Sequence, residues 1–294
     1  MTFVESEIAS QPACWRQAAE AATTLVGSDL LGRPGERIAL IGCGTSWFVA
    51  QVAAAWREGA GLGETDAFTA SEVPDRHYDR IIAITRSGTT SEVLAVLRQV
   101  GGTIPTSVVL GDLDTPAPDA ADAVVDLSFA DEQSVVQTRF ATSALMLFRA
   151  AWRRDVDGLA EAAAEAIIAP LDDSWAAAEQ STFLGRGWTV GLAHEAALKF
   201  RETSSSWAES YPAMDYRHGP ISIAAPGRTV WMFGRPPAGL ADDVTGTGAS
   251  WIADDRDPMA QLVTVQRVAV ARALALGLNP DTPRSLARSV VLSG

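Results

Sequence analysis

A segment with helical spacing carries the only lysine of this chain. The 23 basic side chains are 22 arginines and Lys199. Glu195 lies four residues before the lysine and Glu202 three residues after it, so a helix would place both carboxylates on its face. A guanidinium stays charged at every working pH, whereas a lysine amine is compact and can titrate. The spacing alone fits a solvated ion pair, but the single lysine favours an acid–base site.

The three histidines add further acid–base candidates. His218 lies in the segment Tyr216–Pro220, which ends in Gly-Pro and follows the Glu202 segment, so it is a credible acid–base partner. We expect His77 in a surface loop with a structural role, and His194 in packing or capping. No His-Glu-x-x-His motif or equivalent cluster indicates a metal site.

Two turns rich in serine and threonine, Gly42–Trp47 and Thr85–Ser91, follow apolar runs. Both combine hydroxyls and glycine with the backbone N–H groups of a helix start, which can bind a phosphate without surface cations. The alternative is that these hydroxyls only cap helices.

Two nucleotide-binding motifs do not fit these residues. A dinucleotide fingerprint needs a third glycine where Trp47 stands, and a phosphate-binding Walker loop needs serine or threonine after a lysine. Lys199 is followed by Phe200. The sequence therefore predicts neither nucleotide site.

Apolar runs alternate with helical patterns through the first half of the chain. This alternation predicts a parallel sheet covered on both faces. The predicted strands are Arg37–Gly42, Tyr78–Thr85, Thr106–Leu110 and Ala123–Leu127, and the predicted helices are residues 1–30, 46–58, 87–100 and 136–169.

The pattern then restarts, because Phe183–Val190 repeats the layout of Leu40–Trp47: apolar strand, Gly-x-Gly turn and helix start. Further strands are predicted at Arg228–Phe233 and Ala249–Ala253, and a helix at Pro258–Leu278. We expect an internal duplication with α/β domains at residues 1–165 and 166–294, the first with the N-terminal helix and the second with the C-terminal tail.

The composition excludes several classes of protein. A net charge of −13 and an isoelectric point of about 4.6 argue against binding to nucleic acid or an anionic membrane. The two cysteines show no Cys-x-x-Cys spacing, so neither a disulfide framework nor a zinc site is indicated. No membrane-spanning run or signal-peptide pattern is present, and we expect a cytoplasmic protein.

Six segments, in order and approximate spacing, resemble a known family. They are Ile41–Ser46, Ser87–Thr90, Glu195–Glu202, Ala208–Tyr211, Arg217–Pro220 and Pro283–Ser289. Together they resemble the sugar isomerase (SIS) family, and above all the isomerase half of the glutamine–fructose-6-phosphate amidotransferases. The resemblance covers nearly the whole chain.

This resemblance implies two flavodoxin-like SIS subdomains, each a parallel sheet flanked by helices, and a phosphosugar site without a cofactor or metal. Ser46, Ser87 and Thr90 would hold the phosphate. The other implied substrate-binding residues are Thr45, Thr85 and Arg86 beside the phosphate, Val135 and Gln137 in the loop that approaches the sugar, and Arg288 in the tail.

The same resemblance assigns the chemistry. Glu202 would be the base that moves a proton between C1 and C2 of the sugar, and Lys199 would assist at the sugar hydroxyls. His218, donated by a neighbouring subunit, would open the sugar ring. A homodimer with a shared active site is then expected.

The chain also departs from the amidotransferase pattern. No glutaminase domain precedes the isomerase half and no cysteine stands at position 1 or 2, so we expect no glutamine-derived ammonia. Arg288 stands where the family has a lysine that can form a Schiff base, and a guanidinium cannot. Arg86 replaces a glutamine and Gln137 a small hydroxyl residue, so the substrate is expected to differ.

These features favour a phosphosugar isomerase or aminosugar-phosphate deaminase that acts on a hexose 6-phosphate, such as glucosamine 6-phosphate or fructose 6-phosphate. One alternative is a deglycase for a 6-phosphorylated fructosamine. Another is a non-catalytic phosphosugar-binding regulator. The joint presence of Glu202, Lys199 and His218 favours an enzyme, because binding alone requires only the hydroxyl turns.

Overall fold

The computed structural model describes residues 1–25, 28–152 and 155–292. Their contacts form two compact units. The first-sheet unit comprises residues 10–133, 137–157 and 287–294, and the second-sheet unit comprises residues 1–9, 134–136 and 158–286. Both units are discontinuous along the chain, unlike the continuous division at residue 165 expected from the sequence.

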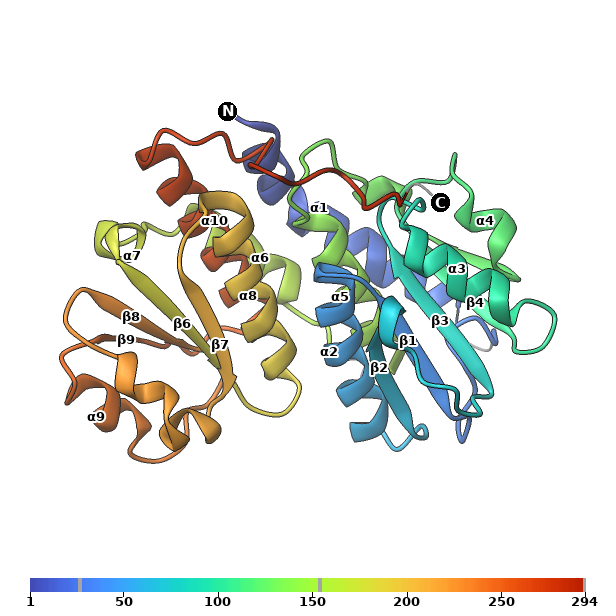
Figure 1. Cartoon of the computed structure of the whole chain (residues 1–294), viewed down its shortest axis with the longest axis horizontal. Coiled ribbons are helices and arrows are strands. Elements are labelled where there is room, and N and C mark those ends of the chain that lie inside the picture. Colours follow the sequence, from blue (N-terminus) through green and yellow to red (C-terminus); the bar gives the residue numbers. More distant parts are fainter. Residues whose placement is uncertain (26–27, 153–154, 293–294) are drawn as a thin grey trace. The chain divides into compact units, whose positions relative to one another are not determined.

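The first-sheet unit contains five parallel strands in the order β2-β1-β3-β4-β5 (Figure 1). Strands β1, β3 and β4 are buried along their whole length, which explains why they are continuous apolar runs in the sequence. The strands are β1 Ile38–Gly42, β2 Thr65–Thr69, β3 Arg80–Thr85, β4 Thr106–Leu110 and β5 Ala123–Asp126.

The helices of this unit are amphipathic or largely buried. In α3, Val93 and Leu97 pack into one core cluster with Ile81 and Ala83 of strand β3. The helices are α2 Thr45–Gly59, α3 Ser91–Val100, α4 Ala117–Ala120 and α5 Arg139–Trp152. The boundary between the units falls within helix α1, Phe3–Thr24.

The second-sheet unit repeats the design with four parallel strands in the order β7-β6-β8-β9. Its strands are β6 Gln180–Gly185, β7 Ala208–Pro212, β8 Arg228–Met232 and β9 Ser250–Ile252. Its helices are α6 Leu159–Ile168, α7 Asp173–Ala177, α8 Thr189–Ser204, α9 Leu240–Thr245 and α10 Pro258–Ala275, with short 3-10 turns at Asp215–His218 and Pro220–Ile223.

The strand order of the first sheet is that of flavodoxin, and the second sheet repeats its first four positions. The predicted α/β class with two flavodoxin-like subdomains is therefore confirmed. Every predicted strand is present, although strands β2 and β7 were not predicted.

One predicted helix is wrong. The alanine-rich stretch 136–169 contains two helices, α5 and α6, and residues 153–154 between them lie outside the described residues. Gly158, immediately before α6, has a φ of 73°, a left-handed conformation that glycine adopts without strain. The helix predicted from Ser87 begins only at Ser91, because residues 85–90 form a turn.

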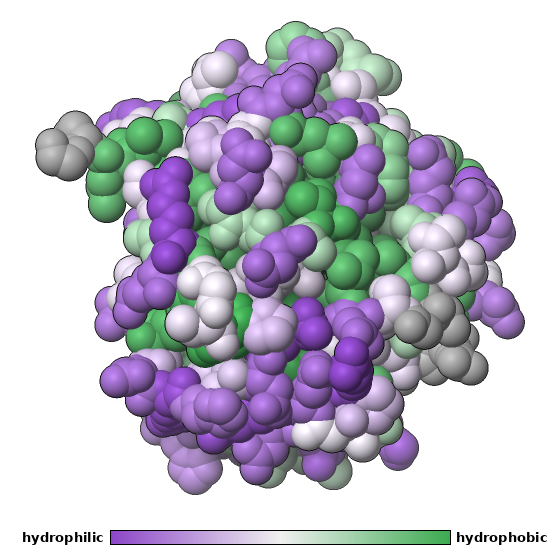
Figure 2. Space-filling view, turned by 90° about the vertical axis from the view of Figure 1, so that its right-hand side faces the viewer, coloured by the Kyte–Doolittle hydropathy of each residue, from purple (hydrophilic) through white to green (hydrophobic). Residues whose placement is uncertain are grey.

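Polar side chains cover much of the face in Figure 2, with apolar side chains gathered among them. In the described ranges, no helix is long and apolar enough to cross a membrane. The same ranges contain no group of three or more histidine, cysteine, aspartate or glutamate side chains that could hold a metal ion.

Candidate functional site

The two hydroxyl-rich turns follow neighbouring strands of the first sheet. Strands β1 and β3 are parallel and adjacent, with Ile41 beside Ala83, so the turns after them leave the same edge. The chain passes from β1 to β2 on one side and returns to β3 on the other, which makes this edge the topological switch point. Ligands of open α/β sheets bind at this position.

Two glycines allow helix α2 to begin directly after β1. A side chain on Gly42 would place its Cβ 2.6 Å from the Cβ of Ser46, and Gly44 has a φ of 55°. The close approach buries Thr45 and Ser46 in the first turn of the helix. Gly44, not a hydroxyl residue, occupies the N-cap position, so the capping alternative does not account for these hydroxyls.

The turn after β3 gathers further hydroxyls at the start of α3. The Thr85 hydroxyl accepts a hydrogen bond from the Gly88 N–H (3.2 Å). The hydroxyl oxygens of Ser87 and Thr90 lie 3.4 Å apart. Thr90 is the N-cap residue of α3, but its side chain makes no capping hydrogen bond. These hydroxyls therefore remain candidates for binding an anion.

The C-terminal tail runs along the same turn. The Ser91 N–H donates to the Val290 carbonyl (3.1 Å), and the Leu292 N–H donates to the Ser91 hydroxyl (2.9 Å). The hydroxyls of Thr89 and Ser289 lie 2.7 Å apart. The tail thus occupies part of the N-terminus of α3.

Arg86, expected beside the phosphate, is only 1% exposed. Its Nη2 donates to the Arg288 carbonyl (2.8 Å), and its Nη1 lies 3.9 Å from a carboxylate oxygen of Glu132. The structure therefore gives this guanidinium partners within the protein, one in the tail and one before helix α5.

Arg288, for which the sequence resemblance implied the position of a Schiff-base lysine, is held by acidic residues. Its Nη2 donates to both carboxylate oxygens of Asp131 (2.6 and 2.8 Å) and lies 3.6 Å from Asp112. Its Nη1 donates to the Glu132 carbonyl. The side chain anchors the tail to the first-sheet unit.

The loop expected near the sugar is divided between the units. In the second-sheet unit, the Val135 N–H donates to the Asp281 carbonyl (3.1 Å), and Glu7 accepts from the N–H and hydroxyl of Ser134. In the first-sheet unit, the amide oxygen of Gln137 is buried and accepts no hydrogen bond from the described residues.

Helix α8 carries the predicted acid–base residues of the second-sheet unit. The Nζ of Lys199 donates to Glu202 (2.6 Å) and lies 3.3 Å from Glu195. Lys199 and Glu195 are only 1% and 2% exposed, so a solvated ion pair does not describe them. Glu202 keeps 21% of its side chain exposed. The helix thus presents one accessible carboxylate against a buried ammonium.

The two carboxylates keep Lys199 charged. Burial lowers the pKa of its amine, but the charges of Glu195 and Glu202 more than offset this, and the pKa lies above its usual value. The ammonium can therefore donate hydrogen bonds at neutral pH, but it is a poor base or nucleophile.

His194, on the same helix, is half-buried and lies 2.8 Å from the Ser210 hydroxyl. Burial, together with the nearby charge of Arg201, lowers the pKa of its imidazole. The ring is therefore neutral at pH 7, which fits the packing role expected from the sequence. His77 is exposed in a loop, also as expected, and lies 3.5 Å from Asp79.

His218 lies exposed on the turn Asp215–His218. Within the described ranges its ring makes no hydrogen bond or ion pair. The neighbouring Arg217 fixes the turn by donating to Asp243 (2.6 Å) and to the Ala238 carbonyl (2.9 Å). The imidazole is therefore accessible on a tethered turn.

Comparison with known proteins gives relatives along nearly the whole chain. A glutamine–fructose-6-phosphate aminotransferase (isomerizing) of Xylella fastidiosa is 26% identical over 361 aligned positions, which cover 99% of this chain and 59% of that protein. A protein of the same name from a Nostoc species is 27% identical and covers 87% of this chain. The resemblance to the sugar isomerase family is confirmed. A scan against models of protein families finds no match.

The chain spans about three-fifths of the length of the Xylella relative.

Solved structures show the same sugar isomerase fold at lower identity. Glucosamine-6-phosphate deaminase from Thermotoga maritima matches this chain with a TM-score of 0.78 and 22% identity. The match covers 99% of this chain and 100% of the deaminase chain. Tagatose-6-phosphate ketose/aldose isomerase from Escherichia coli matches the whole chain with a TM-score of 0.80 and 18% identity, over 96% of that chain.

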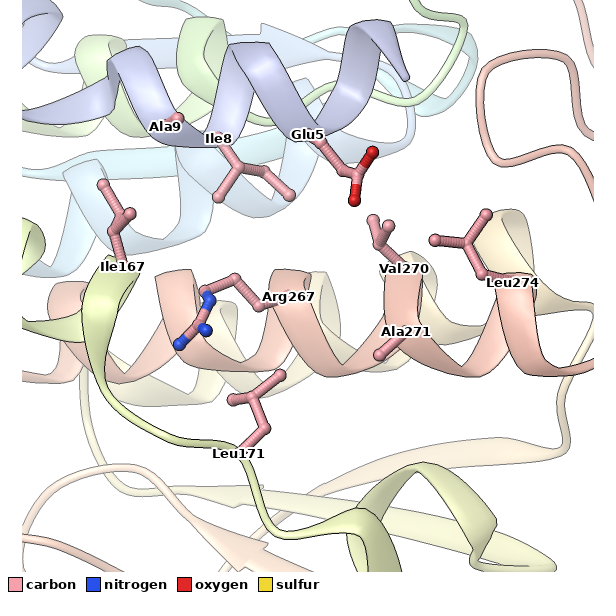
Figure 3. Close-up of a pocket in the computed structure, with 9 residues that line it drawn as sticks. All are labelled: Glu5, Ile8, Ala9, Ile167, Leu171, Arg267, Val270, Ala271 and Leu274. Atoms are coloured by element: carbon pink, nitrogen blue, oxygen red, sulfur yellow. The ribbon is translucent and has the colours of Figure 1, made fainter. Parts of the chain in front are cut away.

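A separate apolar groove of about 290 Å³ lies in the second-sheet unit, between helices α1 and α10 (Figure 3). Its two charged side chains have protein partners, because Glu5 accepts from the Thr2 N–H (2.7 Å) and Arg267 donates to the carbonyls of Ala166 and Ala169. None of the residues expected from the sugar isomerase resemblance lines this groove.

Sequence reasoning missed Glu132. Its side chain is fully buried, and it contacts Arg86 and the start of helix α5. A single glutamate in a polar loop gives no periodic signal in the sequence, so only its contacts in the structure show that it is a buried partner of Arg86.

Of the expected substrate-binding residues, the structure brings Thr85, Ser87 and Thr90 together in one turn.

Proposed function

We propose that this protein acts on a hexose 6-phosphate as a phosphosugar isomerase or an aminosugar-phosphate deaminase. The observation that carries the proposal is the arrangement on α8, where Glu202 is partly exposed and lies 2.6 Å from the buried ammonium of Lys199. Relatives and structural neighbours named for sugar-phosphate isomerisation or deamination support the same chemistry.

Glu202 is the proposed base. A carboxylate that removes a proton from C2 of an open-chain aldose and returns it to C1 converts an aldose to a ketose through an enediol. Lys199 is held in place by Glu195 and Glu202, and its positive charge beside the base can stabilise the negative charge that develops on the sugar oxygens. The lysine is thus assigned an electrostatic role rather than a basic one.

The deaminase direction needs the same proton transfer. With glucosamine 6-phosphate, moving a proton from C2 to C1 turns the C2–amine carbon into an imine. Water then adds at C2 and the C–N bond breaks, which releases ammonia and fructose 6-phosphate. Arg288 offers no amine at the position where the resemblance implies a Schiff-base lysine, which favours this direction.

The hydroxyls of Ser46, Ser87 and Thr90 are the proposed ligands of the phosphate. Their position at the switch point, beside the N-terminus of α2, suits an anion in a chain with a strongly negative net charge. Thr45 and Thr85 lie in the same two turns and are assigned supporting roles.

His218 is the proposed ring-opening acid–base group, supplied by a second copy of the chain in a homodimer. Its exposure on a tethered turn supports this assignment, because a residue that serves a neighbouring subunit must be accessible. Val135 and Gln137 are proposed to contact the sugar.

The proposal is tested by incubating glucosamine 6-phosphate with the purified protein and measuring ammonium and fructose 6-phosphate. The expected result is formation of both products by the wild type and by Glu209→Gln, a matched change elsewhere in the second-sheet unit. Glu202→Gln should form neither product while still binding fructose 6-phosphate. Full turnover by Glu202→Gln would show that the base is wrongly assigned.

A further inference from the structure

One buried glutamate in the first-sheet unit connects three segments that the proposed function uses, two through its carboxylate and one through its backbone carbonyl. Glu132 precedes helix α5 and is fully buried. It contacts Arg86 in the turn after β3, Thr138 at the end of the sugar-facing loop, and Arg288 in the tail.

The carboxylate fixes the start of α5. Its Oε1 accepts three hydrogen bonds, from the N–H of Thr138 (2.6 Å), the hydroxyl of Thr138 (2.8 Å) and the N–H of Arg139 (2.8 Å). A carboxylate at a helix N-terminus satisfies backbone donors and complements the helix dipole. The residue next to Gln137 is therefore held rigidly.

The second carboxylate oxygen faces Arg86. The Oε2 lies 3.9 Å from Nη1 of this arginine, whose own side chain is almost fully buried. Arg86 stands between Thr85 and Ser87, so its position and that of the hydroxyl turn are linked through the backbone. The arginine also donates to the Arg288 carbonyl, while Arg288 donates to the Glu132 carbonyl.

We propose that Glu132 is a positioning residue of the phosphate subsite and that it acts through Arg86. The inference rests on the proposed function. The Glu132 carboxylate has no exposed surface, its Oε1 is occupied by the donors of α5, and its Oε2 lies against a buried guanidinium. Together the pair holds the Ser87 and Thr90 hydroxyls in the geometry that binds a phosphate. Arg86 thus serves the phosphate indirectly rather than as its ligand.

The test compares the affinities for fructose 6-phosphate and for fructose, measured by titration calorimetry. Glu132→Gln keeps an acceptor for the donors of α5 but removes the negative charge that lies 3.9 Å from Nη1 of Arg86. We expect its affinity for fructose 6-phosphate to fall about tenfold, with a matching rise in KM and little change in kcat, because the phosphate is remote from C1 and C2.

A rescue distinguishes this role from general destabilisation. Adding Arg86→Gln removes the buried guanidinium that Glu132→Gln leaves with less negative charge beside it, so the double variant should recover most of the affinity that Glu132→Gln loses, a non-additive result. Arg149→Gln is the control, because it breaks another guanidinium–carboxylate pair of the same unit, 3.2 Å from Asp155. It should lower the melting temperature without changing the affinity for fructose 6-phosphate.

The outcomes separate this inference from the proposed function. If the wild type binds fructose 6-phosphate no better than fructose, both fail. If the wild type prefers the phosphorylated sugar and Glu132→Gln retains that preference in full, only the positioning role is overturned. Additive losses in the double variant would also overturn it. Should Glu132→Gln not fold, Glu132→Asp is measured instead; its shorter side chain draws the carboxylate away from Arg86, so a smaller loss of the same kind is expected, and no loss would overturn the positioning role.

Discussion

The two sheets share their strand order but differ in the turns at their switch points. The first sheet carries Ser46, Ser87 and Thr90 in the turns after β1 and β3. The second sheet carries Arg186 and Arg235 in the corresponding turns after β6 and β8. The same backbone design therefore presents hydroxyls at one edge and guanidinium groups at the other.

The one hydroxyl at the second switch point is already used. Thr189 Oγ1 lies 3.1 Å from the Arg186 carbonyl and 3.0 Å from the Phe233 carbonyl, and accepts from the Arg186 N–H. It ties the two turns together. The chemistry of the second-sheet unit lies instead along α8, at Lys199 and its carboxylates. The fold thus fixes where a switch point lies, and the turn residues decide which side chains it presents.

The largest expected effect tests whether α8 supplies the chemistry. Glu202→Gln should lower kcat about 10³-fold, since a positioned general base contributes roughly 10²–10⁴-fold, and should leave the affinity for fructose 6-phosphate unchanged. Steady-state kinetics and calorimetry check both values. Glu209→Gln should behave like the wild type. If Glu202→Gln retains more than half of kcat, Glu202 of α8 is not the general base.

The next effect concerns the stability of the buried ion cluster on α8. Lys199→Met leaves Glu195 buried without its cation, and breaking such a pair costs about 3–5 kcal/mol of the free energy of unfolding. Denaturant unfolding measures the loss. Arg217→Met breaks a more exposed pair and should cost at most about 1 kcal/mol. Equal losses for the two variants would contradict the burial of the cluster.

The hydroxyl turns predict a smaller effect, on binding. Ser87→Ala removes one proposed ligand of the phosphate and should raise KM about tenfold, since a hydrogen bond to a charged group is worth about 1.5–3 kcal/mol. Arg235→Ala, at the second switch point, should leave KM unchanged. A larger rise in KM for Arg235→Ala than for Ser87→Ala would instead indicate that the phosphate binds at the second switch point.

The smallest effect is a dependence of stability on pH. Burial and the Arg201 charge lower the folded-state pKa of His194, so the unfolded chain binds a proton more readily. Stability should therefore fall as the pH drops below about 6.5, the ordinary histidine value, by at most about 1.4 kcal/mol per pH unit. Thermal unfolding between pH 7.5 and 5 measures the slope. His194→Gln should reduce this slope. An unchanged slope would show that another group causes the dependence of stability on pH.

Much of the fold follows from the sequence. Strands β1, β3 and β4 are buried on both faces, so each is a continuous apolar run bounded by turn residues. Strand β2, Thr-Asp-Ala-Phe-Thr, lies at the edge of the sheet and lacks such a run. The break between α5 and α6 was missed because alanine favours a helix on either side of it.

The candidate site was predictable where residue type and spacing carry the signal. The i, i+3 and i, i+4 spacing around Lys199 placed its carboxylates correctly, but the sequence could not show that the cluster is buried. The sequence also could not predict the partners of Arg86, because Glu132 and Arg288 are far from it along the chain. Long-range contacts of single polar residues leave no periodic pattern.

The central claim is that Glu202 transfers a proton between C1 and C2 of a hexose 6-phosphate. Proton NMR in D₂O, with fructose 6-phosphate and glucosamine 6-phosphate as substrates, tests it most directly. The account predicts that the wild type exchanges the C1 or C2 protons for deuterium, or converts glucosamine 6-phosphate to fructose 6-phosphate and ammonium, and that Glu202→Gln does neither. Tight binding of both sugars by the wild type, with every C1 and C2 signal unchanged, would contradict it.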